Sequence, residues 1–282
     1  VIRACAMLPA VRGNYAKPGA GLLYLNGGGQ KGVDGDYLSA THLSNCPESL
    51  SQMDLAEYLE SAENARAFLC WNINPVASSP EQGRLMEALK REDLFTVVLD
   101  IFATDTTDFA DYILPAASFL EFDDLVSGYF NLSFSAQAKV QEPFGEALPN
   151  QEIFRRLARA MDFSEPELQE SDEDIIAHVI RGVAIEGGFT ALKANGTLFP
   201  NAEPQLQFAD LIFPTPSGKI EIASAAAEAD GHPRLPYPGA DLRPSKGRLR
   251  LITPASKWLM NDSYANDPKA VSYTHLTLPT KA

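Results

Sequence analysis

The sequence predicts an α/β fold: a Rossmann-like parallel sheet layer with flanking helices, followed by a loop-rich linker and the first strand of a truncated, β-rich C-terminal domain. Three observations carry this prediction. Short apolar runs flank an amphipathic helical pattern between residues 65 and 114. Proline becomes frequent between residues 188 and 244. An alternating strand pattern starts again at Arg248.

The Rossmann-like layer is predicted from the order of its elements. A continuously apolar strand over 67–71 leads into a polar loop at 72–79, and Pro80 suits the first turn of a helix over 81–90. A second buried strand spans 95–101, and a third, over 112–114, stops at Pro115. Strand, helix and strand joined by a right-handed crossover give a parallel sheet.

Later elements are predicted from helix caps and periodicity. Asn150 is the expected N-cap of a helix over 151–161, which has an apolar face of Ile153, Phe154, Leu157 and Met161. Ser171, with Asp174 three residues on, resembles a capping box that opens a helix over 172–187. Residues 219–222 suggest an edge strand, and residues 248–253 the first strand of the next domain.

These elements predict five segments. Residues 1–60 end a preceding domain, 61–165 form the Rossmann-like layer, 166–246 are a helical and loop-rich linker, and 247–270 begin the C-terminal domain. Residues 271–282 complete no element and are similar to a translated sequencing adapter, which suggests a non-native tail. Because Val1 opens inside a helix-like stretch without Met, we expect an internal fragment of a longer enzyme.

Composition excludes several classes of function. The chain has 282 residues, 45% of them hydrophobic, with 23 basic against 37 acidic side chains and a net charge of −14, which disfavours nucleic acid and anionic lipid as partners. No window is long and apolar enough for a spanning helix, so we expect a soluble protein without direct membrane insertion, and provisionally a cytoplasmic one. Three scattered cysteines and four isolated histidines predict no metal cluster and no catalytic triad.

Two polar loops are the candidate site. In parallel sheets ligands bind beyond the carboxyl ends of the strands, so the loops after Trp71 and Asp100 should lie side by side. Neutral amides and hydroxyls beside a carboxylate suit a guanine or pterin edge and a ribose better than proton transfer. The alternative is that these residues only form turns and caps. The first loop offers Asn72, Asn74, Ser78 and Ser79, and the second offers Asp100, Thr104, Asp105, Thr106 and Thr107.

Three ordered motifs then resemble the large subunits of the molybdopterin oxidoreductase family, the dimethyl sulfoxide reductase and formate dehydrogenase group. They are the segments 68–75, 97–107 and 110–116, the last followed by Glu121. The similarity continues through 145–147, 150–161, 215–221, 249–254 and 261–263, and so covers nearly all of residues 1–270.

The resemblance implies an enzyme that holds molybdenum, or tungsten, in bis-molybdopterin guanine dinucleotide and carries out two-electron chemistry on a small substrate. It implies that residues 1–60 end a molybdopterin-binding domain and that the two loops bind one dinucleotide. The residues that match the family's loops are Asn72, Asn74 and Pro75 in the first, and Asp100, Thr104 and Thr106 in the second. Thr253, Asn261 and Ser263 match the opening of the C-terminal dinucleotide-binding domain. A separate electron-transfer protein chain is a possible partner, and an iron–sulfur cluster is expected in an N-terminal region outside this sequence.

Some family features are absent or altered. No catalytic residue or metal ligand is expected here, and Cys70 should be a small hydrophobe inside a strand. Asp105 stands where many members have Glu, and Asn131 is not followed by the basic residue that many members carry nearby. A redox-inactive structural relative from a respiratory complex is the alternative to an enzyme, although a scaffold has no reason to keep the polar residues of both loops.

Overall fold

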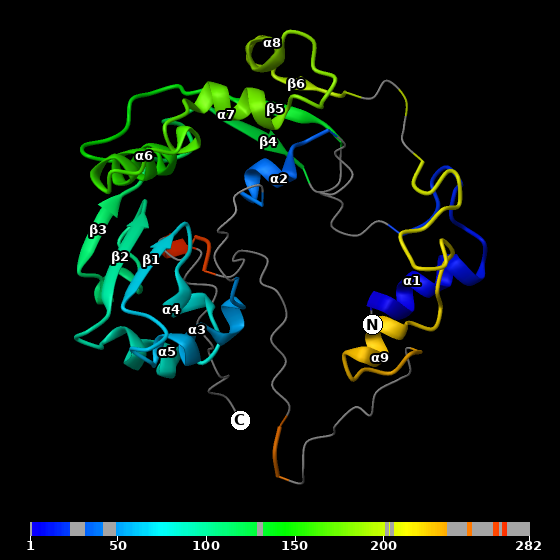
Figure 1. The fold of residues 1–282 in the computed structure, drawn as a ribbon, viewed down its shortest axis with the longest axis horizontal. Helices are drawn as coiled ribbons and strands as arrows, with labels where there is room; N and C mark the ends of the chain where they lie inside the picture. Colours follow the sequence, from blue (N-terminus) through cyan, green and yellow to red (C-terminus); the bar gives the residue numbers. More distant parts are fainter. Residues whose placement is uncertain are drawn as a thin grey trace. The chain divides into compact units, whose positions relative to one another are not determined.

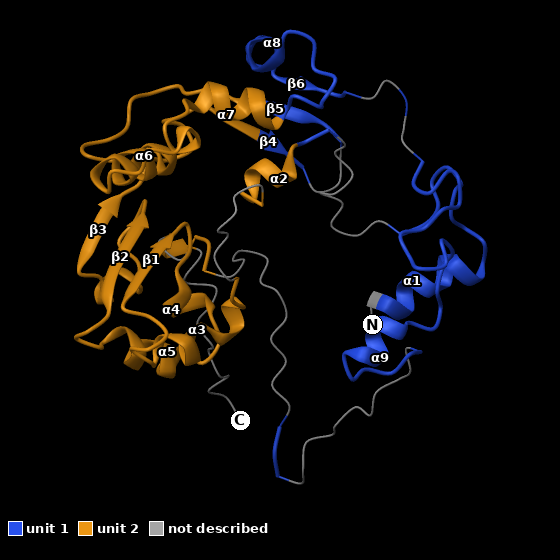
Figure 2. Cartoon of the chain, in the orientation of Figure 1, with its two compact units in different colours: residues 1–33, 126–135, 180–251 blue, residues 34–125, 136–179, 252–282 orange. Residues whose placement is uncertain are grey.

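The computed structural model describes residues 2–22, 32–41, 49–128, 132–200, 203, 206–235, 247–249, 262–264 and 267–269. The chain divides into two compact units, which Figure 2 colours separately. Unit 1 comprises residues 1–33, 126–135 and 180–251, and unit 2 comprises residues 34–125, 136–179 and 252–282.

Unit 2 contains the predicted parallel sheet (Figure 1). Strands β1 (Ala67–Trp71), β2 (Phe95–Asp100) and β3 (Tyr112–Pro115) lie in the order β1-β2-β3, and both pairings are parallel. The register pairs Trp71 with Leu99, and Asp100 with Pro115. The α/β class and the three strands are therefore confirmed, because continuous apolar runs of this length favour strands buried in a sheet.

One face of the sheet carries the main core of unit 2. Helices α3 (Leu55–Leu59) and α5 (Gln82–Leu89) pack together, preceded by the 3₁₀ turn η2 (Gln52–Asp54). Leu85 is fully buried and Leu59 nearly so, and Phe68 of β1 packs against this cluster. The helix predicted over 81–90 is confirmed to within one residue at each end.

The opposite face meets helix α6 (Asn150–Ala160). Trp71 at the end of β1 contacts Phe154 edge to face, with ring centroids 5.2 Å apart. A parallel bridge between Ala116 and Leu148 extends the pairing beyond β3 and brings the start of α6 to the sheet. The predicted amphipathic helix is confirmed, but the residue that occupies the N-cap position is Pro149, and Asn150 is the first helical residue.

Further elements of unit 2 flank the sheet. They are α2 (Gly35–Leu38), α4 (Pro75–Ser78), η3 (Thr107–Phe109), η4 (Pro166–Leu168) and α7 (Asp172–Val179). Ser171 caps α7, since its Oγ accepts from Asp174 N at 3.1 Å and donates to Asp174 Oδ2 at 2.6 Å. Tyr37 of α2 stacks on His178 of α7, with ring centroids 3.9 Å apart.

Unit 1 contains α1 (Ile2–Val11), α8 (Gly188–Asn195), β6 (Thr197–Leu198) and α9 (Ala225–Ala229). A short second sheet has the order β4-β5-β6, with β4 at Asp124–Ser127 and β5 at Phe134–Gln137. The boundary between the units runs through β4 and β5. Pairing between β5 and β6 is antiparallel.

Three sequence expectations differ from the structure. The helix predicted over 172–187 ends at Val179, and a close approach between the backbones of Gly182 and Gly32 follows it. Residues 219–222 form no strand, because a local turn holds this stretch through bonds such as Thr215 Oγ1 to Lys219 O at 2.7 Å. Residues 247–249 show no strand, and the rest of that predicted strand lies outside the described residues. Among the described helices, none has the length and apolar composition needed to cross a bilayer.

Candidate functional site

The loops that follow β1 and β2 meet at the carboxyl edge of the sheet, as predicted. Asn74 Oδ1 accepts hydrogen bonds from Thr106 Oγ1 at 2.7 Å and from Thr106 N at 3.2 Å. Thr106 Oγ1 in turn accepts from Val76 N at 3.2 Å. Both side chains are buried, with exposed fractions of 6% for Asn74 and 0% for Thr106. The two loops are therefore joined by a buried polar network.

Asp105 completes this network. Asn74 Nδ2 donates to Asp105 Oδ2 at 3.2 Å, while the rest of Asp105 is exposed. The shorter side chain at this position, where many members of the resembled family carry Glu, places its carboxylate against Asn74. The polar atoms of Asn74 and Thr106 are thus used within the protein, and the geometry suits these residues to fixing the loops rather than to touching a ligand.

The remaining residues of the first loop surround a short helix that the sequence did not predict. Pro75 is buried at the first position of α4, where its fixed φ angle favours the helix. Ser78 is exposed, and its Oγ donates to Asn74 O at 2.8 Å. The segment predicted as a polar loop therefore contains one helical turn, and Ser78 bonds this turn to the backbone oxygen of Asn74.

Asp100 ends β2 at the same edge and is half-buried. Its Oδ1 accepts from Phe102 N at 3.2 Å, which turns the chain into the second loop. Its backbone oxygen accepts from Ala116 N at 3.0 Å. The side chain thus shapes the start of the second loop, while its backbone contacts the segment after β3.

Thr104 carries an unpaired polar atom. Its backbone N donates to Thr107 Oγ1 at 3.0 Å, but its own Oγ1 is buried and has no hydrogen-bond partner among the described residues. A buried hydroxyl without a partner costs roughly 1–3 kcal/mol. The Thr104 hydroxyl is thus enclosed by the fold at the carboxyl edge of the sheet.

Asn72 and Asn150 form a second polar contact at this edge. Asn72 follows β1 with a left-handed backbone (φ 57°), which Asn tolerates better than most residues. Its Oδ1 accepts from Asn150 Nδ2 at 2.8 Å. Sequence reasoning assigned Asn150 to a helix cap, and no local pattern signals a contact between residues 78 positions apart.

Glu121 is a buried carboxylate that supports the segment after β3. Its exposed fraction is 5%. Oε2 accepts from Ser118 N at 2.7 Å, and Oε1 accepts from Phe144 N at 3.1 Å and from Gln141 Nε2 at 3.3 Å. It therefore anchors residues 141–144 to the loop after β3. The sequence showed only that Glu121 follows the third motif and did not predict this role.

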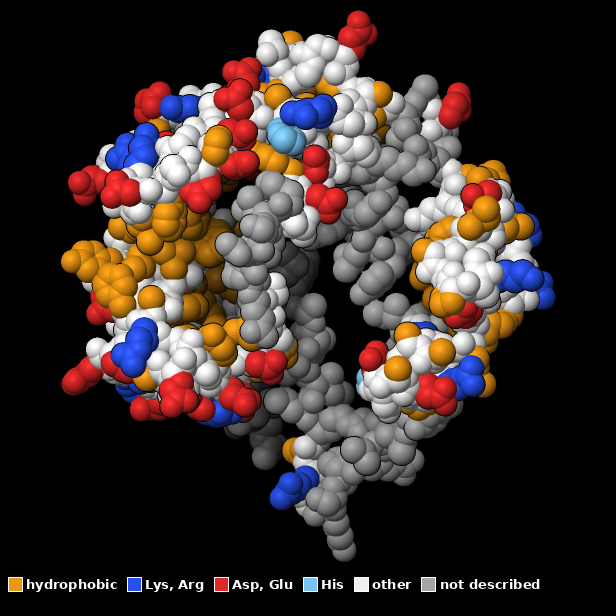
Figure 3. Space-filling view, viewed as in Figure 1, with side chains coloured by type: hydrophobic (Ala, Val, Ile, Leu, Met, Phe, Trp, Pro, Cys, Tyr) orange, Lys and Arg blue, Asp and Glu red, His pale blue; other side chains and the backbone are white. Residues whose placement is uncertain are grey.

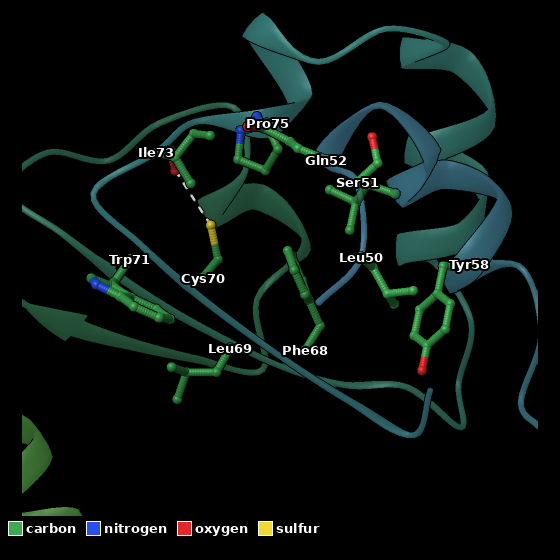
Figure 4. Close-up of a pocket in the computed structure, with 11 residues that line it drawn as sticks. Leu50, Ser51, Gln52, Tyr58, Phe68, Leu69, Cys70, Trp71, Ile73 and Pro75 are labelled. Carbon is green, nitrogen blue, oxygen red and sulfur yellow. Dashed lines mark hydrogen bonds between the residues drawn. The ribbon is translucent and has the colours of Figure 1, made fainter. Parts of the chain in front are cut away.

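Cys70 behaves as a hydrophobe, in agreement with the prediction from its place in a strand. Its side chain is 3% exposed, and its Sγ lies 3.3 Å from Ile73 O, the contact drawn in Figure 4. Burial, and secondarily the charge of Asp100, raises the pKa of the Cys70 thiol to about 12. The thiol therefore stays protonated at neutral pH, which makes it a poor nucleophile and a poor metal ligand.

Three further predicted site residues, Thr253, Asn261 and Ser263, come from the C-terminal part of the chain. Thr253, Asn261 and Asn131 lie outside the described residues, and Ser263 is exposed. Within the described ranges, no group of three or more His, Cys, Asp or Glu side chains has a geometry that could hold a metal ion.

The chain belongs to the molybdopterin oxidoreductase family, whose model matches residues 1–160. A probable oxidoreductase, YoaE of Bacillus subtilis, is 31% identical over 278 residues, which is 96% of this chain and 40% of the relative. The catalytic chain of a putative dimethyl sulfoxide reductase of Halobacterium salinarum is 29% identical over 67% of this chain and 24% of its own length.

Other relatives agree with this assignment. The alpha chain of an F420-dependent formate dehydrogenase of Methanocaldococcus jannaschii is 29% identical over 71% of this chain and 32% of its own length. In fold, the chain matches acetylene hydratase from Pelobacter acetylenicus with a TM-score of 0.55, covering 67% of this chain and 26% of that protein at 23% identity. The chain thus spans well under half the length of these relatives.

Proposed function

We propose that the loops after β1 and β2 bind one dinucleotide of a bis-molybdopterin guanine dinucleotide cofactor that carries molybdenum or tungsten. The observation that carries the proposal is the buried bond between Asn74 and Thr106, which fixes two polar loops beside Asp100 at the carboxyl edge of a parallel sheet. Membership of a family of molybdopterin-dependent oxidoreductases supports the choice of ligand.

The local chemistry fits a nucleotide. The half-buried Asp100 carboxylate is an acceptor for the N–H groups of a guanine edge or for ribose hydroxyls. Asn74, Thr106, Pro75 and Ser78 hold the loops in place. The metal, when bound, supplies two-electron redox chemistry, whereas these residues bind and orient the nucleotide end of the cofactor.

The proposal extends to the larger protein. We propose that it oxidises or reduces a small molecule, that a separate electron-transfer protein chain serves it, and that an iron–sulfur cluster lies outside this sequence. A structural relative without cofactor is less well supported, because a scaffold has no reason to keep polar side chains at the carboxyl ends of two adjacent strands.

Substitution of Asp100 tests the proposal. Asp100→Ala removes the acceptor between the loops, so we expect the chain, produced in cells that make the cofactor, to retain several-fold less pterin. The measurement is pterin fluorescence and guanine nucleotide released on denaturation, per mole of protein. Asp108→Ala, which removes an exposed carboxylate nearby, is the control and should retain the wild-type content. Unchanged pterin in Asp100→Ala refutes the assigned contact.

A further inference from the structure

Strand β1 lies at an edge of the parallel sheet. The order β1-β2-β3 leaves one side of β1 without a partner strand among the described residues. Phe95 N donates to Arg66 O at 2.9 Å. Because successive residues of a strand direct their backbone groups to opposite sides, Phe68 and Cys70 bond to β2. The residues whose N–H and C=O groups face the open side are Ala67, Leu69 and Trp71.

The sequence of this edge strand is unlike that of a protected edge. Edge strands usually carry a charge, a proline or a bulge that prevents pairing with another chain. The run Ala67–Trp71 has no charge and no proline, and its register with β2 is continuous. Such a run is typical of a strand buried inside a sheet, yet Ala67 is exposed and Trp71 is 47% exposed. The edge is therefore able to accept a further strand.

Two apolar cavities flank the open side. Figure 4 shows the side chains of Phe68 and Cys70 on one side of β1 and that of Leu69 on the other. On the first side, a pocket of about 460 Å³ lies beside β1 and residues 50–58, and no charged residue lines it. On the second side, a groove of about 880 Å³ along α6 reaches β1 and is lined mainly by hydrophobic residues. A strand beside β1 directs successive side chains alternately toward these cavities, so it must be apolar at successive positions.

The chain itself contains a strand of this kind, since β1 is apolar at every position. We propose that β1 of one copy pairs antiparallel with β1 of a second copy about a two-fold axis, which joins their three-stranded sheets into one. With Leu69 on the axis, Leu69 lies opposite its own counterpart and Ala67 lies opposite Trp71, so the largest side chain meets the smallest. These pairs are the hydrogen-bonded ones of an antiparallel ladder, and every N–H and C=O group that faces the open side finds a partner. The inference concerns assembly and does not depend on cofactor binding.

Charge and size agree with a second copy as the occupant. The chain carries a net charge of −14, so two copies repel each other at most contacts. The residues of β1 and the lining of the neighbouring pocket are uncharged, which lets two copies approach there. A single pair of strands is smaller than the roughly 800 Å² per partner of a standard interface. We therefore expect a weak dimer in reversible exchange with the monomer.

Sedimentation velocity between about 1 and 100 μM chain tests the pairing, because this range covers micromolar dissociation constants. We expect the wild type to shift from monomer to dimer over the range. Ala67→Lys puts a charge on the exposed edge and should raise the dissociation constant about tenfold or more. Ala226→Lys, which adds the same charge at an exposed position of α9, is the control and should leave the dissociation constant unchanged.

Hydrogen exchange followed by mass spectrometry locates the contact without any substitution. The amides of Leu69 and Trp71 face the open side, so their protection should rise as the chain concentration rises. The amides of β3 should exchange at the same rate at every concentration. A dimer in which residues 67–71 gain no protection overturns the proposal.

Other results also overturn it. A chain that stays monomeric up to about 100 μM does so, as does an equal effect of Ala67→Lys and Ala226→Lys. Tyr112→Lys distinguishes the edge from the uncovered sheet face, because Tyr112 lines the groove from β3. If Tyr112→Lys abolishes dimerisation and Ala67→Lys does not, the copies meet through the groove and the strand pairing is wrong.

Discussion

At the scale of single residues, Thr106 links the two loops of the candidate site through one hydroxyl. That hydroxyl donates to Asn74 Oδ1 and accepts from Val76 N, and the residue is fully buried. Thr106→Val keeps the shape but leaves the Val76 N–H without an acceptor. We therefore expect the free energy of unfolding to fall by about 1–3 kcal/mol, measured by urea denaturation.

The matched control for this change is Thr190→Val, because Thr190 is exposed on α8. It should alter the free energy of unfolding by less than about 0.5 kcal/mol, as surface substitutions usually do. Equal effects of the two substitutions would show that the network between the loops adds no stability. In that case the backbone bond from Thr106 N and the bond from Asn74 to Asp105 would suffice to hold the loops together.

At the scale of elements, two glycines respond in opposite ways to the same change. A Cβ on Gly182 would lie 2.6 Å from Gly32 O, whereas a Cβ on Gly83 of α5 meets nothing within 4 Å. We expect Gly182→Ala to destabilise unit 1 by about 1–3 kcal/mol because the backbone must move. Gly83→Ala should stabilise unit 2 by about 0.5–1 kcal/mol, because Ala favours the helix.

Hydrogen exchange followed by mass spectrometry measures both effects, since it reports the amides of each unit separately. Faster exchange in residues 180–200 is expected for Gly182→Ala, and slower exchange in residues 82–90 for Gly83→Ala. Unaltered exchange around Gly182 would contradict the close approach of the two backbones.

A comparison of predicted and observed elements shows which features of the fold the sequence predicts. The strands were predictable because each is a short apolar run in the sequence. The proximity of the two loops was predictable because neighbouring parallel strands end at the same edge of the sheet. The partners of Asn74 and Asn150 were not, because these bonds join residues 32 and 78 positions apart and no local period reports them. The strand predicted over 219–222 was wrong because turn bonds from Thr215 and Ser217 outweigh a short apolar alternation.

At the scale of the whole molecule, the α6 face of the parallel sheet is only partly covered. A groove of about 880 Å³ lies between the sheet and α6, and Figure 3 shows hydrophobic side chains gathered there. Phe95, Tyr112 and Met161 line it and are 49%, 62% and 54% exposed. Parallel sheets are usually buried on both faces. The apolar face of α6 therefore extends beyond its contact with the strands.

This groove should bind an apolar dye. We expect the chain to enhance 1-anilinonaphthalene-8-sulfonate fluorescence, and Tyr112→Lys, which places a charge in the groove, to reduce that enhancement several-fold with little loss of stability, since Tyr112 is mostly exposed. Phe144→Lys is the control, because Phe144 is 88% exposed and does not line the groove. Equal dye binding by the two variants would mean that the dye reports scattered exposed side chains rather than the uncovered sheet face.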